Sequence, residues 1–283
     1  MPSSSSDDLG RDSWLVSAGW LRQRLAAEPA LVIDERPRAE YEAGHIPGAV
    51  HLPTFLRLIG GTDPRSLGAV RRQWAALYAA VGVTPDTTVV LYDKGLSNRA
   101  PRGLFILRYL GHPRAYVLHG GFPDWVEAGG PVARGRGEAT HARGPAWRPA
   151  PRQEMVCSAS ELRSLLVDGA GVTVLDVRSE AEFRGWVRLQ GNPRVGHLPG
   201  VAWTHWVDFL TDERRLRPRQ ELEAMLGELG VSRGRETIVY CQRSHRASNT
   251  YLVLRELGYP CRVYLGSMYE WTRLPDDFPL EVS

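Results

Sequence analysis

Residues 237–257 read TIVYCQRSHRASNTYLVLREL, and this stretch carries the strongest structural signal in the chain. Its first four residues form an apolar run typical of a buried strand. From Tyr251 onward, apolar residues recur in a pattern that favours a helix. Cys241 stands where the strand ends, and Arg243, His245 and Arg246 follow it closely. A strand, a polar loop and a helix in this order indicate an α/β protein.

The whole chain has the composition of an ordinary soluble globular protein. Its 283 residues suffice for one large domain or two ordinary ones. The formal net charge of +3 comes from 35 basic and 32 acidic residues, so it gives no reason to expect nucleic acid or a membrane surface as partner. No apolar run approaches the roughly 18 residues of a membrane helix. The start MPSSSSDDLGRDS is not a signal peptide, so we expect a disordered lead-in and a cytoplasmic location.

The chain contains three cysteines, Cys157, Cys241 and Cys261. Three cysteines cannot all pair, and a reducing compartment disfavours disulfides. No CxxC or paired Cys/His spacing suggests a zinc site, so no metal is expected. The economical interpretation is one reactive thiol and two inert ones.

The sequence repeats itself. LVIDERPRAEYEAGHIPGAV has a counterpart in TVLDVRSEAEFRGWVRLQGNPRVGHLPGV, with Asp34 matching Asp176 and His45 matching His197. The second copy has ten more residues between these matches, around WVRLQGNPRV. Similarity that continues over several segments at nearly constant spacing indicates a duplicated domain.

A second block of the repeat contains the cysteine loop. Arg99 in YDKGLSNRA matches Arg246 in YCQRSHRAS, and further on Trp125 of GGFPDW matches Trp271 of GSMYEW. Between the copies, Ala133–Glu154 is rich in Gly, Pro and Arg and is interpreted as an extended linker. We therefore predict an N-terminal domain at 1–132, a linker at 133–154 and a C-terminal domain at 155–283.

Each copy predicts the same order of elements, in which helices alternate with apolar strands. This order indicates an α/β fold with two tandem domains, each a mainly parallel sheet flanked by helices. In the first copy we expect helix, strand, helix, strand, helix and strand at Ser17–Ala27, Leu31–Asp34, Val70–Val81, Thr88–Tyr92, Arg99–Leu110 and Ala115–Leu118. In the second copy we expect them at Ser160–Leu166, Val172–Asp176, Gln220–Leu229, Thr237–Tyr240, Arg246–Leu257 and Arg262–Leu265.

The cysteine loop is the candidate functional site. In such a sheet, ligands bind beyond the carboxyl ends of the strands, and Cys241 occupies that place. We expect the loop to curl so that backbone N–H groups point toward the sulfur. These groups, the helix dipole and the three basic side chains favour a thiolate and would hold an anionic substrate.

The alternative is that Cys241 is simply a small packing residue, as an isolated cysteine after a buried strand usually is. Six hydrophilic flanking positions argue against this and predict a partly exposed, reactive thiol. Cys157 and Cys261 have no such polar cluster, so they are predicted to pack.

The chain resembles the tandem-domain rhodaneses, the thiosulfate or 3-mercaptopyruvate sulfurtransferase family. The resemblance runs from about Trp14 to Trp271 and rests on GHIPGA and GHLPGV, the cysteine loop and GSMYEW. It implies that the second domain is catalytic and that the first, with Asp93 in place of the cysteine, is inactive. The loop departs from the family's commoner form, which has glycine at the position of Ser244.

The resemblance also implies a reaction in two halves. The Cys241 thiolate takes the outer sulfur of thiosulfate or the sulfur of a mercapto acid, both small sulfur-containing anions. The resulting persulfide passes that sulfur to cyanide or to a thiol, which can belong to a protein acceptor. No metal or organic cofactor is required. The candidate substrate-binding residues in the loop are Gln242, Arg243, Ser244, His245 and Arg246.

Outside the loop, Arg178 of LDVR is a further candidate for substrate binding. It either faces the site or ties down its own loop through an ion pair with Asp176, and the sequence leaves both open. His197 belongs to a turn motif and is predicted to be structural, whereas Trp203 and Trp206 are predicted to pack.

Rival functions use the same cysteine. A dual-specificity phosphatase or arsenate reductase also has a cysteine cradle, but its loop places five residues between cysteine and arginine, whereas four intervene here. A persulfide carrier or sensor would use the same chemistry without turnover, and nothing in the sequence excludes it. As donor, thiosulfate is favoured over 3-mercaptopyruvate because two arginines in the loop complement a dianion.

Overall fold

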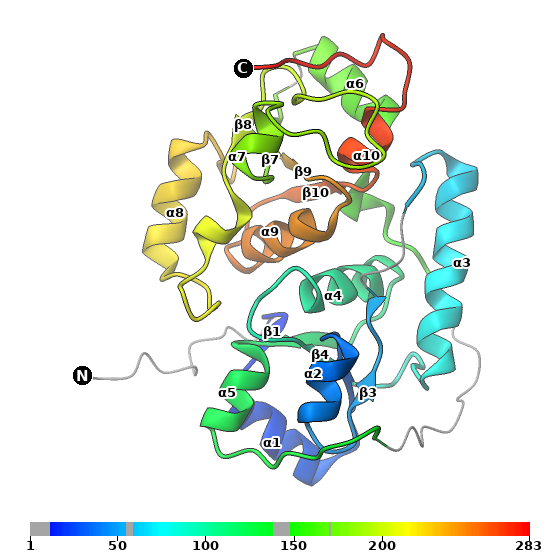
Figure 1. The fold of residues 1–283 in the computed structure, drawn as a ribbon, viewed down its shortest axis with the longest axis vertical. Helices are drawn as coiled ribbons and strands as arrows, with labels where there is room; N and C mark the ends of the chain where they lie inside the picture. The colour runs from blue at the N-terminus through cyan, green and yellow to red at the C-terminus, as the bar shows by residue number, and fades with distance from the viewer. Residues whose placement is uncertain (1–11, 55–58, 138–147, 170) are drawn as a thin grey trace. The chain divides into compact units, whose positions relative to one another are not determined.

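The structure, a computed structural model, describes residues 12–54, 59–137, 148–169 and 171–283. The chain divides into two compact units, coloured along the sequence in Figure 1. Unit 1 comprises residues 1–56, 73–151 and 212–215, and unit 2 comprises residues 57–72, 152–211 and 216–283. Most of the predicted lead-in and the middle of the predicted linker lie outside the described residues.

Unit 1 contains a five-stranded sheet in the order β1-β5-β4-β2-β3, and all of its paired strands are parallel. The strands are β1 (Leu15–Val16), β2 (Leu31–Asp34), β3 (Val50–His51), β4 (Val89–Tyr92) and β5 (Ala115–Leu118). The three central strands have no exposed residue, as expected for a parallel sheet covered on both faces.

The helices that begin in the first copy are α1 (Ala18–Ala27), α2 (Arg38–Ala43), α3 (Pro64–Ala80), α4 (Ala100–Tyr109) and α5 (Gly121–Glu127). Ser17 caps α1, its side chain accepting a hydrogen bond from Trp20 N at 3.1 Å. The helices predicted at the positions of α1 and α4 agree with the structure to within one residue at each end.

α3 begins earlier than the sequence predicts. Apolar periodicity places its start at Val70, whereas the helix starts at Pro64. Asp63 Oδ1 accepts hydrogen bonds from Arg65 N at 3.0 Å and Ser66 N at 3.1 Å. An aspartate cap followed by proline in the first turn is a strong helix start. The start predicted from apolar periodicity is therefore wrong, because the first turn of α3 is stabilised by its Asp63 cap.

Unit 2 repeats the architecture of unit 1. Its sheet has the order β6-β10-β9-β7-β8, again with every paired strand parallel. The strands are β6 (Val156–Cys157), β7 (Thr173–Asp176), β8 (Ala202–Trp203), β9 (Thr237–Tyr240) and β10 (Cys261–Tyr264). The helices are η2 (Gln153–Met155), α6 (Ala159–Val167), α7 (Glu180–Phe183), η3 (Trp206–Phe209), α8 (Arg219–Glu228), α9 (His245–Glu256) and α10 (Ser267–Trp271).

The two sheets correspond strand by strand. β2 and β4 pair with Asp34 opposite Tyr92, and β7 and β9 pair with Asp176 opposite Tyr240. The predicted duplication and the predicted α/β class are therefore confirmed. None of the helices within the described ranges has both the length and the apolar character that crossing a membrane requires.

Each unit also contains a segment that the chain supplies from the other copy of the repeat. Residues 57–72 follow β3 of the first copy but belong to unit 2, and residues 212–215 of the second copy belong to unit 1. The predicted domain limits follow the repeat in the sequence. They therefore assign these two exchanged segments to the copy in which they occur and not to the unit that they contact. At the predicted linker, Ala133 still pairs with His45 of unit 1.

The histidines of the GHxPG turns contact their own units. His197 Nδ1 lies 2.9 Å from Phe183 O, and its ring stacks on Phe183 with 3.9 Å between centroids. His45 Nδ1 lies 2.8 Å from Tyr41 O and stacks on Tyr41 at the same distance, 3.9 Å. The same contacts in both copies agree with the structural role predicted for this turn.

Candidate active site

Cys241 directly follows β9, and α9 begins four residues later at His245. β9 is the central strand of the unit 2 sheet, with β10 on one side and β7 on the other. Figure 1 shows α9 alongside β9 and β10, with which it is in contact. The cysteine therefore lies at the carboxyl end of a parallel strand and at a helix N-terminus, where α/β sheets bind ligands.

Cys241 and most of its loop are buried, so the prediction of a partly exposed thiol is wrong. Cys241 is 1% exposed, Gln242 and His245 are 7% exposed and Ser244 is fully buried. Polar groups tolerate burial where they find hydrogen-bond partners. This loop finds them on α10 and on the segment inserted in the second copy, so its hydrophilic sequence does not report its exposure.

Ser267, the first residue of α10, holds the two ends of the loop. Its Oγ accepts hydrogen bonds from Cys241 N at 3.3 Å and Ser244 N at 3.1 Å, and it donates one to Tyr264 O at 3.0 Å. Ser267 is fully buried, with φ of 53°. The prediction that the loop N–H groups point toward the sulfur is wrong for these two, because they donate to Ser267. We call this arrangement the Ser267 clamp.

α10 also binds the carbonyl groups of the loop. Met268 N donates to Cys241 O at 3.0 Å, and Tyr269 N donates to Gln242 O at 2.9 Å. The first N–H groups of a helix have no partner within the helix, so the loop carbonyls satisfy them. Cys241 is thus fixed by α10 through both its N–H and its carbonyl.

Among the described residues of unit 1, the Ser267 clamp has no equivalent. Gly121 occupies the matching position, four residues before Trp125 as Ser267 is before Trp271. A Cβ atom on Gly121 would clash with the carbonyl oxygen of Asp93 and the nitrogen of Gly95. No serine fits there, so the clamp belongs to the copy that carries the cysteine.

Ser244 adopts the left-handed conformation that favours glycine, with φ of 58° and ψ of 4°. It is the N-cap of α9, and its Oγ donates to Arg243 O at 2.7 Å. A non-glycine residue in this conformation costs about 1–2 kcal/mol. The position therefore suits glycine for a conformational reason, and serine keeps the same backbone.

We expect Ser244→Gly to leave the reactivity of Cys241 close to that of the wild type, because glycine adopts this backbone freely. Ser244→Val should lower the free energy of unfolding by about 2 kcal/mol and slow the reaction of Cys241, because a β-branched residue resists positive φ. Chemical denaturation and alkylation of Cys241 by iodoacetamide measure the two effects. A slow Ser244→Gly variant would instead assign the role to the hydroxyl.

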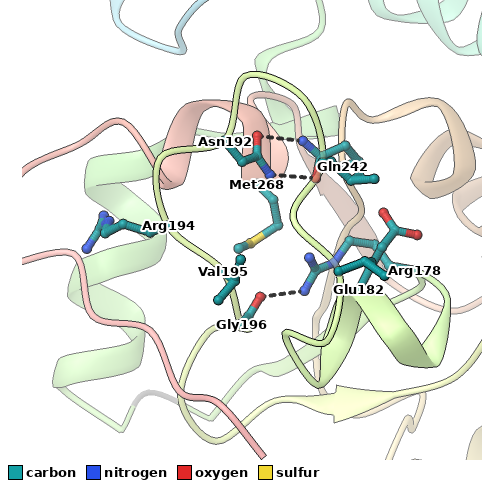
Figure 2. Close-up of a pocket in the computed structure, with 10 residues that line it drawn as sticks. Arg178, Glu182, Asn192, Arg194, Val195, Gly196, Gln242 and Met268 are labelled. Atoms are coloured by element: carbon teal, nitrogen blue, oxygen red, sulfur yellow. Dashed lines mark hydrogen bonds between the residues drawn. The ribbon is translucent and has the colours of Figure 1, made fainter.

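Gln242 is paired with a residue of the ten-residue insertion. Asn192 Nδ2 donates to Gln242 Oε1 at 3.1 Å, and Gln242 Nε2 donates to Asn192 Oδ1 at 2.8 Å. Figure 2 shows both bonds at the edge of a small pocket. The other residues that line it are Arg178, Glu182, Val187, Leu189, Arg194, Val195, Gly196 and Met268. The insertion thus braces the loop, and the amide of Gln242, a predicted substrate ligand, is occupied by this pairing.

Arg246 forms a buried ion pair. Its Nη1 and Nη2 donate to the two carboxylate oxygens of Glu182 at 2.6 Å and 2.7 Å. Burial raises the pKa of Glu182, but the hydrogen bonds and charge of Arg246 outweigh it and hold the pKa at about 2. Burial disfavours the Arg246 cation, yet Glu182 and the nearby Cys241 raise its pKa. Arg246 therefore lies near the cysteine with both terminal nitrogens bound to Glu182.

Arg178 ties down its own loop. Nε donates to Asp176 Oδ1 at 3.0 Å, and Nη2 donates to Asp176 Oδ2 at 2.6 Å and to Gly196 O at 2.9 Å. Figure 2 shows the bond to Gly196. In unit 1, Arg36 binds Asp34 in the same way. Of the two interpretations that the sequence left open, the structure contains the ion pair.

Arg243 is the loop arginine that retains donor capacity. Its guanidinium carbon lies 4.7 Å from the ring centroid of Tyr269. Within the part of the chain that the structure describes, its Nε has no hydrogen-bond partner. His245 is the first residue of α9 and is buried beside it in the loop. Because both terminal nitrogens of Arg246 are bound to Glu182, Arg243 is better placed than Arg246 to bind an incoming anion.

Of the other two cysteines, Cys157 packs in the core as predicted, and Cys261 is half-buried. Cys157 lies on β6 within the hydrophobic core of unit 2, and burial raises the pKa of its thiol. Cys261 begins β10, and burial raises the pKa of its thiol to about 12. All three cysteines are free. Over the described ranges, no group of three or more His, Cys, Asp or Glu side chains could hold a metal ion.

In the corresponding loop of unit 1, the carboxylate of Asp93 accepts hydrogen bonds from the loop itself. Asp93 Oδ2 accepts hydrogen bonds from Ser97 Oγ and from Ala100 N at the start of α4. Burial raises the pKa of Asp93 to about 6, although these hydrogen bonds oppose the shift. The aspartate thus serves as an internal cap at the position that Cys241 has in unit 2.

Three residues that hold the cysteine loop were absent from the sequence candidates: Ser267, Asn192 and Glu182. Ser267 lies in GSMYEW and Asn192 in the ten-residue insertion, and the sequence singled out both segments without assigning these side chains a role. Glu182 lies three residues after Ser179, and the two form a capping box at α7. That spacing is visible in the sequence, but it does not reveal the partner Arg246.

The fold and the site together define an α/β protein with two duplicated units, one of which presents a cysteine in a strand-to-helix loop. The chain belongs to the Rhodanese-like domain family, whose model matches residues 17–128 and 158–274. These two matches cover most of both copies of the repeat and confirm the resemblance noted in the sequence.

Named relatives match over nearly the whole chain. The Thiosulfate sulfurtransferase of Pseudomonas aeruginosa is 32% identical over 266 residues, which are 93% of this chain and 94% of that protein. A protein of the same species named Probable 3-mercaptopyruvate sulfurtransferase is 30% identical over 286 residues, 92% of this chain and 95% of that protein. The crystal structure of YnjE is similar with a TM-score of 0.80 at 25% identity, over 95% of this chain and 68% of that one.

Proposed function

We propose that this protein is a thiosulfate sulfurtransferase that moves the outer sulfur of thiosulfate to cyanide or a thiol through a persulfide on Cys241. The observation that carries the proposal is the position of Cys241 at the end of β9, in a loop whose Arg243 has no hydrogen-bond partner at Nε among the described residues. The name of one relative, Thiosulfate sulfurtransferase, supports this activity, whereas the name of the other, Probable 3-mercaptopyruvate sulfurtransferase, supports sulfur transfer from the alternative donor.

In the first half-reaction, the Cys241 thiolate attacks the outer sulfur of thiosulfate. A new S–S bond forms at Sγ, the S–S bond of thiosulfate breaks, and its electron pair leaves with sulfite. Arg243 and His245 bind the oxygens of the donor and stabilise the departing anion through charge-assisted hydrogen bonds.

In the second half-reaction, the acceptor attacks the terminal sulfur of the persulfide. With cyanide, a C–S bond forms, the S–S bond breaks and its electron pair returns to Sγ as the Cys241 thiolate. The cycle needs no metal or organic cofactor. Because the donor product leaves before the acceptor reacts, ping-pong kinetics are expected.

The remaining candidate residues hold the site in position within this proposal. Arg246 does so through its ion pair with Glu182, and Arg178 fixes the neighbouring loop after β7 through its ion pair with Asp176. Gln242 acts through its side-chain amide, which Asn192 holds, and Ser244 through its left-handed backbone. The division into a nucleophile, two anion-binding residues and four positioning residues is therefore part of the proposal.

The test is turnover with two donors in parallel. The purified protein is mixed with cyanide and either thiosulfate or 3-mercaptopyruvate, and thiocyanate is followed. We expect thiosulfate to react faster, because Arg243 complements a compact dianion. A faster reaction with 3-mercaptopyruvate would overturn the choice of donor and keep the persulfide chemistry.

The mass of the protein after exposure to each donor separates the remaining alternatives. An added sulfur atom on the Cys241 peptide without thiocyanate release would favour a persulfide carrier that hands its sulfur to a protein thiol. No adduct with either donor would reject sulfur transfer. The proposal also places the protein in the cytoplasm, where its three free cysteines suit a reducing compartment.

A further inference from the structure

In both units, a carboxylate in the last helix of the repeat binds the segment supplied by the other copy. Asp124 of α5 and Glu270 of α10 are matching residues, since each directly precedes the matched tryptophan. Asp124 binds Arg215 of the exchanged segment 212–215, with 2.9 Å between Oδ1 and Nη2. Glu270 binds Thr62 of the exchanged segment 57–72. The two contacts are equivalent in position but differ in chemistry.

The contact in unit 2 is buried and fully hydrogen-bonded. Thr62 N donates to Glu270 Oε1 at 2.6 Å, and Thr62 Oγ1 donates to Oε2 at 2.8 Å. Tyr264 Oη donates to Oε2 at 3.0 Å, and Ala159 N donates to Thr62 Oγ1 at 2.9 Å. Thr62 is 3% exposed and Glu270 is 7% exposed. The Thr62 hydroxyl therefore joins α10 to the start of α6.

Glu270 belongs to the same short helix that holds the cysteine loop. α10 has five residues, Ser267–Trp271. Its first residue forms the Ser267 clamp, and its next two donate to the carbonyls of Cys241 and Gln242. A helix of this length has little stability of its own, so its position depends on the contacts made by its side chains. The contact with Thr62 is one of these.

We propose that Thr62 is a positioning residue for Cys241, acting through Glu270 and α10. The proposal rests on Cys241 being the reactive group of the proposed function. It gives the copy without a cysteine a direct task, because Thr62, one of the residues that hold α10 next to the catalytic loop, comes from that copy. Unit 2 is then incomplete as a catalyst without Thr62.

The physical argument concerns what the loss of the hydroxyl does to α10. Thr62→Val keeps the shape of the side chain but leaves Glu270 Oε2 and Ala159 N each one hydrogen bond short in a buried site. Both groups relax to recover partners, and α10 moves with Glu270. A nucleophile displaced by a fraction of an ångström loses rate steeply, so a tenfold effect is a reasonable scale.

The experiment compares three variants of the full chain. Thr62→Val removes the hydroxyl, and Thr62→Ser retains it. Arg215→Gln breaks the matching contact in unit 1, which lacks the cysteine, and serves as the control. For each variant we measure alkylation of Cys241 by iodoacetamide from about pH 6 to pH 9, located by peptide mapping. Thiosulfate kinetics and Tm are measured alongside.

Thr62→Val is expected to lower the alkylation rate and kcat about tenfold with KM for thiosulfate unchanged. Thr62→Ser should restore both rates, because its hydroxyl reaches the same partners. Arg215→Gln should lower Tm without changing either rate. The KM-against-kcat separation and the rescue distinguish positioning of Cys241 from a general loss of stability.

Two results would overturn the inference. One is a Thr62→Val protein with a lower Tm but wild-type alkylation and kcat, which would make the contact merely structural. The other is an Arg215→Gln protein slowed as much as Thr62→Val, which would mean that any exchanged segment has the same effect. Alkylation requires no sulfur transfer, so it tests Thr62 even if the wild type fails to use thiosulfate.

Discussion

Replacing Cys241 with serine is expected to lower thiosulfate turnover by at least about a thousandfold. A serine hydroxyl remains protonated at neutral pH and cannot carry a transferable sulfur as a persulfide does. The substitution changes little in volume, so the buried loop should keep its hydrogen bonds to α10, two of which come from the Cys241 backbone. Thiocyanate formation and the mass of the donor-treated protein measure the loss, and circular dichroism verifies the fold.

The matched control is Cys261→Ser, which removes a thiol elsewhere in the same unit. Cys261 lies at the start of β10, where burial raises the pKa of its thiol to about 12, so it should contribute nothing to turnover. A Cys241→Ser protein that still forms thiocyanate at a substantial rate would show that the sulfur does not travel on Cys241. An added sulfur atom mapped to Cys261 would relocate the chemistry.

The central strands of both sheets could be predicted because their apolar sequence matches their buried position in a parallel sheet. Leu31–Asp34 and Thr237–Tyr240 are short, mostly apolar runs that polar loops follow, and both are buried strands. The internal repeat then doubled the information, since each copy supported the interpretation of the other. Two-residue strands such as β1 and β6 have no period of their own, so they were missed.

The reactive cysteine could be predicted from the sequence of one loop, but the residues that hold this loop in position could not. Ser267 lies 26 residues after Cys241, and Asn192 lies 50 residues before Gln242. No periodicity connects such pairs, because their contact depends on how the sheet brings loops together. The prediction that the thiol is partly exposed is wrong for the same reason. Its polar residues suggested solvent, whereas their partners on α10 and the insertion allow them to be buried.

The exchanged segments show a further limit of sequence reasoning. The repeat assigns Thr62 to the first copy, and its hydrogen bonds assign it to the second unit. An internal repeat reflects duplication of the sequence, whereas a compact unit is defined by contacts between residues. The boundaries of the two can therefore differ. Only the three-dimensional arrangement reveals which copy uses a given segment.

Breaking the ion pair behind the cysteine loop should have the largest effect on stability. We expect Glu182→Gln to lower the free energy of unfolding by about 3 kcal/mol at neutral pH, because it leaves the Arg246 cation without its counter-charge in a buried site. The side chains of Glu182 and Arg246 are 8% and 17% exposed, so water screens the pair weakly. Denaturant unfolding between about pH 2 and pH 7 measures the effect.

The pH dependence of this loss follows from the pKa of Glu182, which lies at about 2 in the folded protein against an ordinary value of 4.5. A lowered folded pKa means that the contribution is fully present above the ordinary value and disappears as pH falls toward 2. The difference between wild type and Glu182→Gln should therefore be constant above about pH 5.5 and shrink at lower pH.

Glu180→Gln is the matched control, because Glu180 pairs with Arg184 on the surface of the same helix. Exposed pairs of this kind contribute little, so unfolding should change by less than about 0.5 kcal/mol. Adding Arg246→Met to Glu182→Gln should recover part of the lost stability, because the uncompensated charge is removed with its partner. If Glu182→Gln is no less stable than the control at pH 7, or its deficit grows in acid, then the buried pair does not hold the loop.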